Sequence, residues 1–385
     1  MSKNVAIVGV GFTQPQLKTV QVSYKEMVYE AAVKAYDNAH LASHKDIDGF
    51  VGCAEDLIEG TSIFDEYTPD QLGAVQKPVH TISGDLLHGL LVATMKIKTG
   101  IMDIVVVEAH SKASNLKTYY HVTNYALDPT WNRPLNVNPY YLAGLEKNYF
   151  MHHTKTTLEQ IAGVVVKNKK NALQNDLAVF PEQTTVEKVL QSKPNFTPQT
   201  EAETAKQADG AFVFVLANEE TAKKLSKKPV WITGMGWASD SPTLETRNWD
   251  EALYAKTSAH MALKQAHIKN IKEIDFFEID DRFAYKELQH LESIGLYGKG
   301  KAGQALQNGD LNKDGKTPTN VSGGMLGCGS LLEAAGAIRA LEVVKQLRGE
   351  AGQRQLSKAN TALALSWRGI PTTSGAVLTF SRSLS

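Results

Sequence analysis

The chain has 385 residues and a mass of 42.1 kDa, of which 42% are hydrophobic and 21% charged, as expected for a globular protein with a large core and roughly two to three domains. Its 41 basic and 41 acidic residues cancel, which argues against a nucleic-acid binder or a polybasic membrane-surface protein. The sequence has no long apolar run, no signal-peptide pattern and only two cysteines, so we expect a cytoplasmic protein without disulfides or a bound metal.

The first predicted elements form a strand–helix–strand unit. Val5 to Gly11 is a short apolar strand that leads into a G-x-G turn. A helix is expected next, because Ser23 and Glu26 have the spacing of a capping box ahead of apolar residues at helical intervals. A second strand is expected at Ile47 to Phe50.

Gly9 and Gly11 match only the start of a dinucleotide-binding fingerprint. That motif requires a third glycine at the helix start, and Gln14 occupies this position. We therefore interpret the two glycines as a turn that leaves a buried strand.

The first half of the chain continues with a glycine-containing turn at residues 83–85, which opens a helix that ends at Gly100. A strand follows at Ile104 to Val107. The segment from about 115 to 202 departs from this pattern and contains an amphipathic helix near Leu158 to Lys170. We interpret this segment as a cap inserted over one half of the molecule.

The second half repeats the first. Val230 to Gly236 matches the first strand and its turn, Asp250 is a candidate helix cap, and Ile274 to Phe277 matches the second strand. The remaining predicted elements are a glycine-rich turn at 323–336, a helix that ends at Gly349, and strands at Thr361–Leu365 and Gly375–Phe380. Two such halves, 1–228 and 229–385, imply right-handed crossovers and a mostly parallel or mixed buried sheet.

These halves, the cap and several motifs in a fixed order resemble the thiolase superfamily, and in particular its archaeal and sterol-carrier-type acetyl-CoA acetyltransferases. The motifs are SKASN (111–115), VVVKNKKNALQNDLA (164–178), ADGAFVFVLA (208–217), EIDDRFAYKELQHLESIGL (278–296), KGKAG (299–303) and PTNVSGGMLGCG (318–329). The resemblance covers nearly the whole chain. It implies two five-stranded sheets in an α-β-α-β-α arrangement, an acyl-CoA thioester as substrate or ligand, and no covalently bound cofactor.

The resemblance also implies a catalytic centre that this chain does not reproduce. In the family, a cysteine at a helix N-terminus takes the acyl group, a histidine in a G-H-P-x-G motif assists it, and a second cysteine moves the substrate proton. Here Ser83 stands at the nucleophile, Ser330 at the histidine, and Asp280 at the first position of the H-D-x-F motif. The last motif contains Ser366 and Trp367 in place of a cysteine. The glycines that the resemblance assigns to coenzyme A binding are Gly323, Gly324, Gly329 and Gly375.

A serine needs an adjacent base to act as a nucleophile, so a covalent acyl-enzyme is not expected here. His80, three residues before Ser83, is a candidate base, with a structural role as the alternative; His88 lies on another side of the helix from Ser83. Cys328 is either a relocated nucleophile or a small residue that fits a tight turn.

A group of polar residues follows the predicted strand that ends at Ile279. Asp280 would repel a developing oxyanion, but it could act as a general base. Asp281 is a second candidate in this group, and its alternative role is to cap the helix that carries Tyr285. Tyr285 and Tyr297 are candidates for acid–base groups, by resemblance to members of the family that lack the cysteine.

Three functions remain open from the sequence. The chain is an enzyme that carries out retro-aldol chemistry on acyl-CoA thioesters, a non-catalytic binder or scaffold subunit for coenzyme A esters, or an acetyl-CoA acetyltransferase that uses Cys328. The resemblance also implies a small acyl-CoA-binding partner of OB-fold and zinc-ribbon type. A homodimer or tetramer is expected, paired through the segment 78–83, which is rich in β-forming residues.

Overall fold

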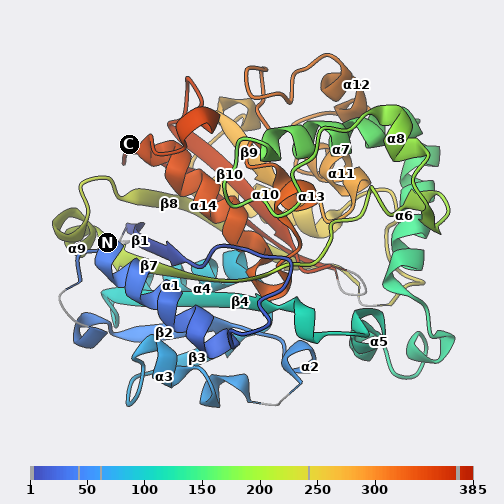
Figure 1. Cartoon of the computed structure of the whole chain (residues 1–385). Helices are drawn as coiled ribbons and strands as arrows, with labels where there is room; N and C mark the ends of the chain where they lie inside the picture. Colours follow the sequence, from blue (N-terminus) through green and yellow to red (C-terminus); the bar gives the residue numbers. More distant parts are fainter. Residues whose placement is uncertain (1–3, 42–43, 61–62, 242, 370–372, 385) are drawn as a thin grey trace.

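The computed structural model describes residues 4–41, 44–60, 63–241, 243–369 and 373–384 (Figure 1). The first half contributes five strands, in which β2 pairs in parallel with β3 and β4 while β7 lies antiparallel between β4 and β1. Their bounds are β1 (Val5–Phe12), β2 (Gly49–Cys53), β3 (Val79–Ile82), β4 (Ile104–Lys112) and β7 (Asp209–Asn218).

The second half contributes four strands with the same kinds of pairing. Strand β9 pairs in parallel with β10, and β11 lies antiparallel between β10 and β8. Their bounds are β8 (Val230–Ser239), β9 (Phe276–Ile279), β10 (Thr361–Trp367) and β11 (Ser374–Ser381). Strands β2 and β9 each begin two residues later than predicted.

The expectation of two separate five-stranded sheets is wrong for the described residues. Nine strands form one sheet in the order β3-β2-β4-β7-β1-β8-β11-β10-β9. The halves join because β1 pairs with β8, although only over Val5 to Ile7. A counterpart of β3 in the second half is reduced to a single bridge between Phe277 and Thr319.

The helices complete the layers that the resemblance implies. One hydrophobic core surrounds α4 and α14 between the two halves, a second lies under α1, and a third lies under α10, α11 and the cap (Figure 1). The α-β-α-β-α order is therefore confirmed. The helices are α1 (Tyr24–Asn38), α2 (Asp56–Glu59), α3 (Pro69–Leu72), α4 (Leu86–Lys98), α5 (Tyr119–Thr123), α6 (Pro139–Thr154), α7 (Leu158–Ala172), α8 (Val186–Leu190), α9 (Glu219–Leu225), α10 (Leu253–Gln265), α11 (Ala284–Ser293), α12 (Ala302–Gln307), α13 (Gly324–Cys328) and α14 (Ala335–Arg348).

The cap runs outward from β4 through α5 to α8 and returns to β7; its only strands among the described residues are β5 (Pro194–Phe196) and β6 (Gln199–Thr200). Among the helices described, none is both long and apolar enough to cross a membrane.

The interpretation of Gly9 and Gly11 as a turn is wrong, because both lie inside β1. A Cβ atom on Gly11 would lie 2.1 Å from the carbonyl oxygen of Ala31 in α1. The second half repeats this contact, since a Cβ on Gly236 would lie 2.1 Å from the carbonyl oxygen of Ser258 in α10. The repeated G-x-G therefore lets each helix backbone approach its strand closely.

Local helix signals are mostly confirmed. Ser23 and Glu26 form the predicted capping box of α1, and Asp85 caps α4 by accepting from the Leu87 N–H at 3.1 Å. The proposed cap at Asp250 is wrong, because α10 begins three residues later. The Asp250 side chain instead forms an ion pair with Lys299 at 2.7 Å.

Candidate functional site

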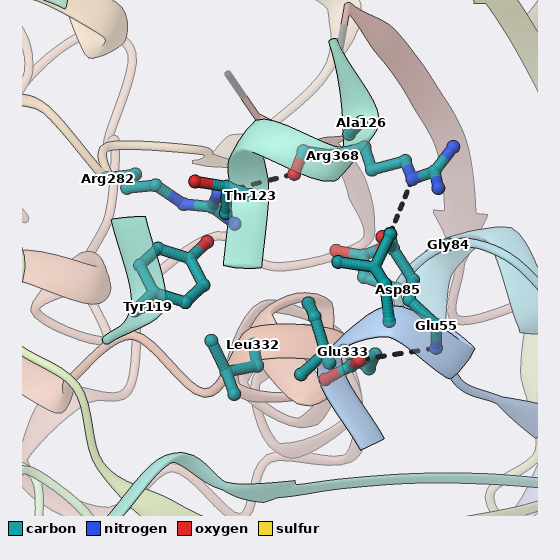
Figure 2. A pocket seen from close by; sticks show the side chains of 12 residues that line it. Glu55, Gly84, Asp85, Tyr119, Thr123, Ala126, Arg282, Leu332, Glu333 and Arg368 are labelled. Atoms are coloured by element: carbon teal, nitrogen blue, oxygen red, sulfur yellow. Dashed lines mark hydrogen bonds and ion pairs between the residues drawn. The ribbon is translucent and has the colours of Figure 1, made fainter. Parts of the chain in front are cut away.

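A cavity of about 30 Å³ lies beside the N-terminus of α4, where both halves of the molecule meet the cap (Figure 2). Its walls come from all three parts of the chain, since the first half, the cap and the second half each contribute side chains. The lining residues are Glu55, Leu57, Ile58, Gly84, Asp85, Tyr119, Thr123, Ala126, Arg282, Leu332, Glu333 and Arg368. Neither of the chain's two cysteines is among them.

Ser83 lies at the edge of this cavity, at the start of α4, and its side chain is exposed. Its hydroxyl oxygen accepts a hydrogen bond from the Arg368 guanidinium at 3.3 Å. Arg368 is also ion-paired with Glu55. The serine at the family's nucleophile position therefore faces a cation, and a cation does not activate a hydroxyl for attack.

Glu333 is the most unusual group in the cavity. Its side chain is buried, one oxygen accepts from the Glu55 N–H at 3.3 Å, and the other oxygen has no hydrogen-bond partner in the structure described. Burial, together with Glu59 and Glu55, raises the pKa of Glu333 well above its usual value. Glu333 therefore holds its proton more tightly than an ordinary glutamic acid does.

The backbone places Glu333 in the cavity through a strained turn. A short 3₁₀ helix over Leu332–Ala334 carries it just before α14, and Leu332 has a positive φ of 46°. Non-glycine residues with positive φ are uncommon and often mark functional positions. With the G-H-P-x-G motif placed on Gly329 and Ser330, Glu333 occupies the position of the motif's last glycine.

A second cavity of about 20 Å³ adjoins the first, and Tyr119 and Arg282 line both. Its other lining residues are Pro139, Tyr140, Thr204, Ala205, Gln207, Phe283 and Ser330. Burial raises the pKa of Tyr119, and Arg282 opposes this shift only in part, so the hydroxyl stays protonated. The second cavity is therefore lined by one cation, neutral hydrogen-bonding groups and apolar walls.

Behind the cavities, Arg339 of α14 joins two carboxylates. It lies 3.0 Å from Asp280 and 3.4 Å from Asp85, and it also donates to the Ser366 hydroxyl at 2.7 Å. Burial would raise the pKa of Asp85, but hydrogen bonding to His88 and the charges of His88 and Arg339 lower it. This network fixes the start of α4 against the second half of the molecule.

Asp280 and Asp281 therefore have structural partners. Asp280 is fully buried and does not line either cavity described above. The sequence suggested that Asp281 caps the helix that carries Tyr285, but the structure shows that it does not. It accepts from the N–H groups of Met325 and Leu326 and so caps α13 instead.

Several other predicted site residues lie away from the two cavities. Tyr285 is buried and donates to Glu146 at 2.7 Å. Cys328 is buried, its thiol donates to the Ser322 carbonyl at 3.3 Å, and burial raises its pKa well above the usual value. His80 is exposed on the edge strand β3. Tyr297 is half-buried against the Thr317 hydroxyl.

The predicted coenzyme A-binding glycines are packed against protein atoms. A Cβ on Gly324 would lie 2.2 Å from an Asp281 oxygen, and one on Gly375 would lie 2.6 Å from Tyr254. Gly323 and Gly329 have positive φ values of 102° and 106° at the two ends of α13. All four positions require glycine for the fold itself.

Sequence reasoning missed the charged residues that line the first cavity. Arg282 lies within the DDRF motif, Arg368 directly follows Trp367, and Glu333 lies three residues after Ser330. Each therefore lies within or directly beside a family motif, and a charged residue at such a position was the available signal. Glu55 and Tyr119 lie outside all the motifs, and the sequence held no comparable signal for them.

Comparisons with known proteins agree with this architecture. Residues 236–381 match the family model described as thiolase C-terminal domain-like. The acetyl-CoA acetyltransferase of Methanothermobacter thermautotrophicus is 30% identical over 370 residues, which cover 94% of this chain and 95% of the relative. Sterol carrier protein 2 of Bos taurus is 27% identical, over 94% of this chain and 70% of its own length. The solved structure named Ltp2-ChsH2(DUF35) aldolase has a TM-score of 0.83 at 22% identity, over 98% of both chains.

Proposed function

This chain belongs to the thiolase superfamily, and from that premise we propose that it binds acyl-CoA thioesters and cleaves the bond between their α and β carbons by retro-aldol chemistry. No covalent acyl-enzyme is formed in this reaction. The substrate is a β-hydroxyacyl-CoA, and the products are a shorter acyl-CoA and a ketone or aldehyde.

One observation carries the proposal: the cavity beside the α4 N-terminus is lined by three carboxyl residues, Glu55, Asp85 and Glu333, and by two arginines, while both thiols lie elsewhere. Glu55 is ion-paired with Arg368, whereas burial and the nearby Glu59 and Glu55 raise the pKa of Glu333. Two titratable groups whose environments differ in this way are the usual basis for dividing the roles of base and acid.

The reaction balances without a further reactant. The Glu55 carboxylate accepts the proton of the β-hydroxyl group, and the Cα–Cβ bond breaks as the β carbon becomes a carbonyl. The bonding electrons pass into the thioester as an enolate, and Glu333 then donates a proton to the α carbon. Proton transfer from the Glu55 carboxyl back to the Glu333 carboxylate restores the starting state.

The enolate oxygen requires a positive environment as it forms. The guanidinium of Arg368 next to Ser83, together with the positive end of the α4 dipole, supplies this environment. The likeness to a structure named as an aldolase is consistent with such chemistry.

The test uses a panel of β-hydroxyacyl-CoA thioesters and measures the acyl-CoA and carbonyl products by chromatography. We expect turnover that falls about 10²- to 10⁴-fold in Glu333→Gln, since one positioned acid is worth this much. Glu182→Gln is the matched control, because that carboxylate is half exposed and lies outside both cavities. Absence of turnover across the panel, or a Glu333→Gln rate equal to that of the wild type, would contradict the proposal.

A non-catalytic role is the second candidate, and the small size of the first cavity, about 30 Å³, favours it. In that case the chain binds a coenzyme A ester or supports an active partner without turning it over. Binding of acyl-CoA without product formation, both alone and with a partner, would select this candidate.

We also propose a small OB-fold and zinc-ribbon partner, which docks on the cap. The structural neighbour's name pairs Ltp2 with ChsH2(DUF35), and the cap exposes large apolar side chains that include Tyr125, Trp131 and Leu135. The Trp131 side chain is 70% exposed. Exposed apolar groups gathered in one segment are typical of interaction surfaces. Copurification with such a protein, lost in Trp131→Ala, tests the proposal; unchanged copurification in this variant would contradict docking on the cap.

Self-association through β3 is a separate proposal. This strand lies at an edge of the sheet, so its outer hydrogen-bonding groups are available for pairing with a second copy. Light scattering coupled to size-exclusion chromatography should give a dimer or tetramer, and a monomer would contradict the proposal.

A further inference from the structure

Arg282 differs from the other arginines at the centre of the molecule. Arg339 is paired with Asp280 and Asp85, and Arg354 is paired with Glu342 at 2.9 Å. The guanidinium of Arg282 has no carboxylate partner among the described residues. It donates to the Arg368 carbonyl at 3.2 Å, and its Nε is buried without a hydrogen-bond partner.

This unpaired cation stands between the two cavities. Figure 2 shows its guanidinium and the Tyr119 hydroxyl on the side of the first cavity opposite Glu333. Beyond them, the described residues that line the second cavity include no acidic side chain. The first cavity, in contrast, has Glu55, Asp85 and Glu333. The second cavity therefore offers a negative group the charge of Arg282 with no carboxylate in the described lining to compete for it.

Further hydrogen-bonding side chains line the second cavity beside Arg282. Tyr119, Tyr140 and Ser330 bring hydroxyl groups to its wall, and Gln207 brings an amide. Burial raises the pKa of Tyr140, and the charge of Arg282 opposes this shift only in part, so this hydroxyl also stays protonated. A cation surrounded by neutral donors on apolar walls matches the chemistry of a carboxylate.

We propose that Arg282 binds a carboxylate on the acyl part of the substrate, so that this protein selects acyl-CoA thioesters whose acyl chain carries a second acid group. The inference rests on the proposed function for the acyl-CoA thioester and adds the class of acyl chain. Its physical reason is that the partly buried Arg282 guanidinium has no carboxylate within ion-pairing distance among the described residues, so an incoming carboxylate can form paired charge-assisted hydrogen bonds with it.

The test compares the binding of succinyl-CoA and butyryl-CoA by isothermal titration calorimetry. The two ligands have four-carbon acyl chains, and they differ in whether the chain ends in a carboxylate or a methyl group. We expect the wild type to bind succinyl-CoA about 10- to 100-fold more tightly, since hydrogen bonds to charged groups contribute on this scale.

The variant Arg282→Met should bind the two ligands with equal affinity, while its aliphatic chain still covers Trp367 as Arg282 does. Arg282→Lys keeps the charge without the bidentate fork and should give an intermediate preference. Arg382→Met is the matched control, because this arginine is exposed and lies outside both cavities; its preference should equal that of the wild type.

The outcomes separate this inference from the proposed function. Equal affinity of the wild type for both ligands would overturn the carboxylate site and leave acyl-CoA binding intact. If neither ligand binds, the acyl-CoA proposal itself is wrong. If Arg282→Met lowers affinity for both ligands equally, Arg282 serves the thioester instead, and the inference is overturned. The wild-type comparison and Arg282→Lys decide the question even if the methionine variant does not fold.

Discussion

The guanidinium of Arg339 lies 3.0 Å from the carboxylate of Asp280, and both side chains are buried. Asp280 also accepts from the backbone N–H groups of Arg282 and Trp367. These contacts tie the end of β9 to α14 and β10 behind the cavities. The first position of the family's H-D-x-F motif therefore supports the architecture of the site in this chain.

Loss of this ion pair should strongly destabilise the fold. In Asp280→Ala, the longer contact with Asp85 is the only ion pair that Arg339 keeps among the described residues, so we expect the free energy of unfolding to fall by about 3–5 kcal/mol. Urea denaturation measures the change. Asp250→Ala removes the more exposed pair with Lys299 and should cost about 0–1 kcal/mol. Equal losses in the two variants would refute the structural role of Asp280.

Cys328 should be dispensable for activity. Its thiol is buried, is bonded to the Ser322 carbonyl and lines neither cavity, so Cys328→Ala should leave turnover unchanged and cost about 1 kcal/mol of stability. Product assays and denaturation on the same preparation measure both effects. A variant that folds normally but loses thiolysis of acetoacetyl-CoA would restore the hypothesis of a relocated nucleophile.

The repeated glycines should tolerate no side chain. A Cβ at position 11 or 236 would lie 2.1 Å from a helix carbonyl oxygen, so Gly11→Ala or Gly236→Ala should cost about 3 kcal/mol through forced separation of helix and strand. Gly298→Ala is the control, because its Cβ would meet no atom closer than 3.9 Å. Thermal unfolding measures the loss of stability, and an equal loss in all three variants would contradict this explanation.

Stability should fall as the pH rises towards neutrality, in part through Asp281. Burial, followed by the charge of Glu287, raises the pKa of Asp281 from 3.8 to about 7. Between these values the folded state keeps a proton that the unfolded state releases, so folding becomes less favourable as the pH rises, by at most about 4 kcal/mol.

The variant Asp281→Asn should reduce this pH dependence, because the amide oxygen still accepts from the Met325 N–H without titrating. Urea unfolding at about pH 5 and about pH 8 measures the slope. Some slope should remain, since burial also raises the pKa of Glu278 to about 8. A variant whose slope equals that of the wild type would show that Asp281 does not contribute.

Much of the fold could be predicted from local patterns. The capping box at Ser23 and Glu26, the turn at residues 83–85 that opens a helix and the helix end at Gly349 each depend on residues within one or two turns of one another. Periodic apolar residues then located the helices and the repeated strands. The position of Ser83 at the start of α4 followed from the family motif and this local spacing.

The consecutive residues Asp280, Asp281 and Arg282 mark the limit of such reasoning. Their side chains diverge to Arg339, to the N-terminus of α13 and to the two cavities. The spacing of residues along the chain does not predict this divergence, because the partners Arg339, Met325 and the Arg368 carbonyl all lie more than forty residues away.

The sequence by itself determined the family, the duplicated halves and the absence of cysteine and histidine from the aligned motif positions, since these depend on residue identity and short-range periodicity. Only the tertiary structure decided which groups line the cavity beside those positions. Glu333 enters the cavity through a turn with positive φ at Leu332, and its pKa is raised because the fold buries it beside Glu55 and Glu59. Burial and long-range charge set protonation and pairing, and both arise only when distant segments pack together.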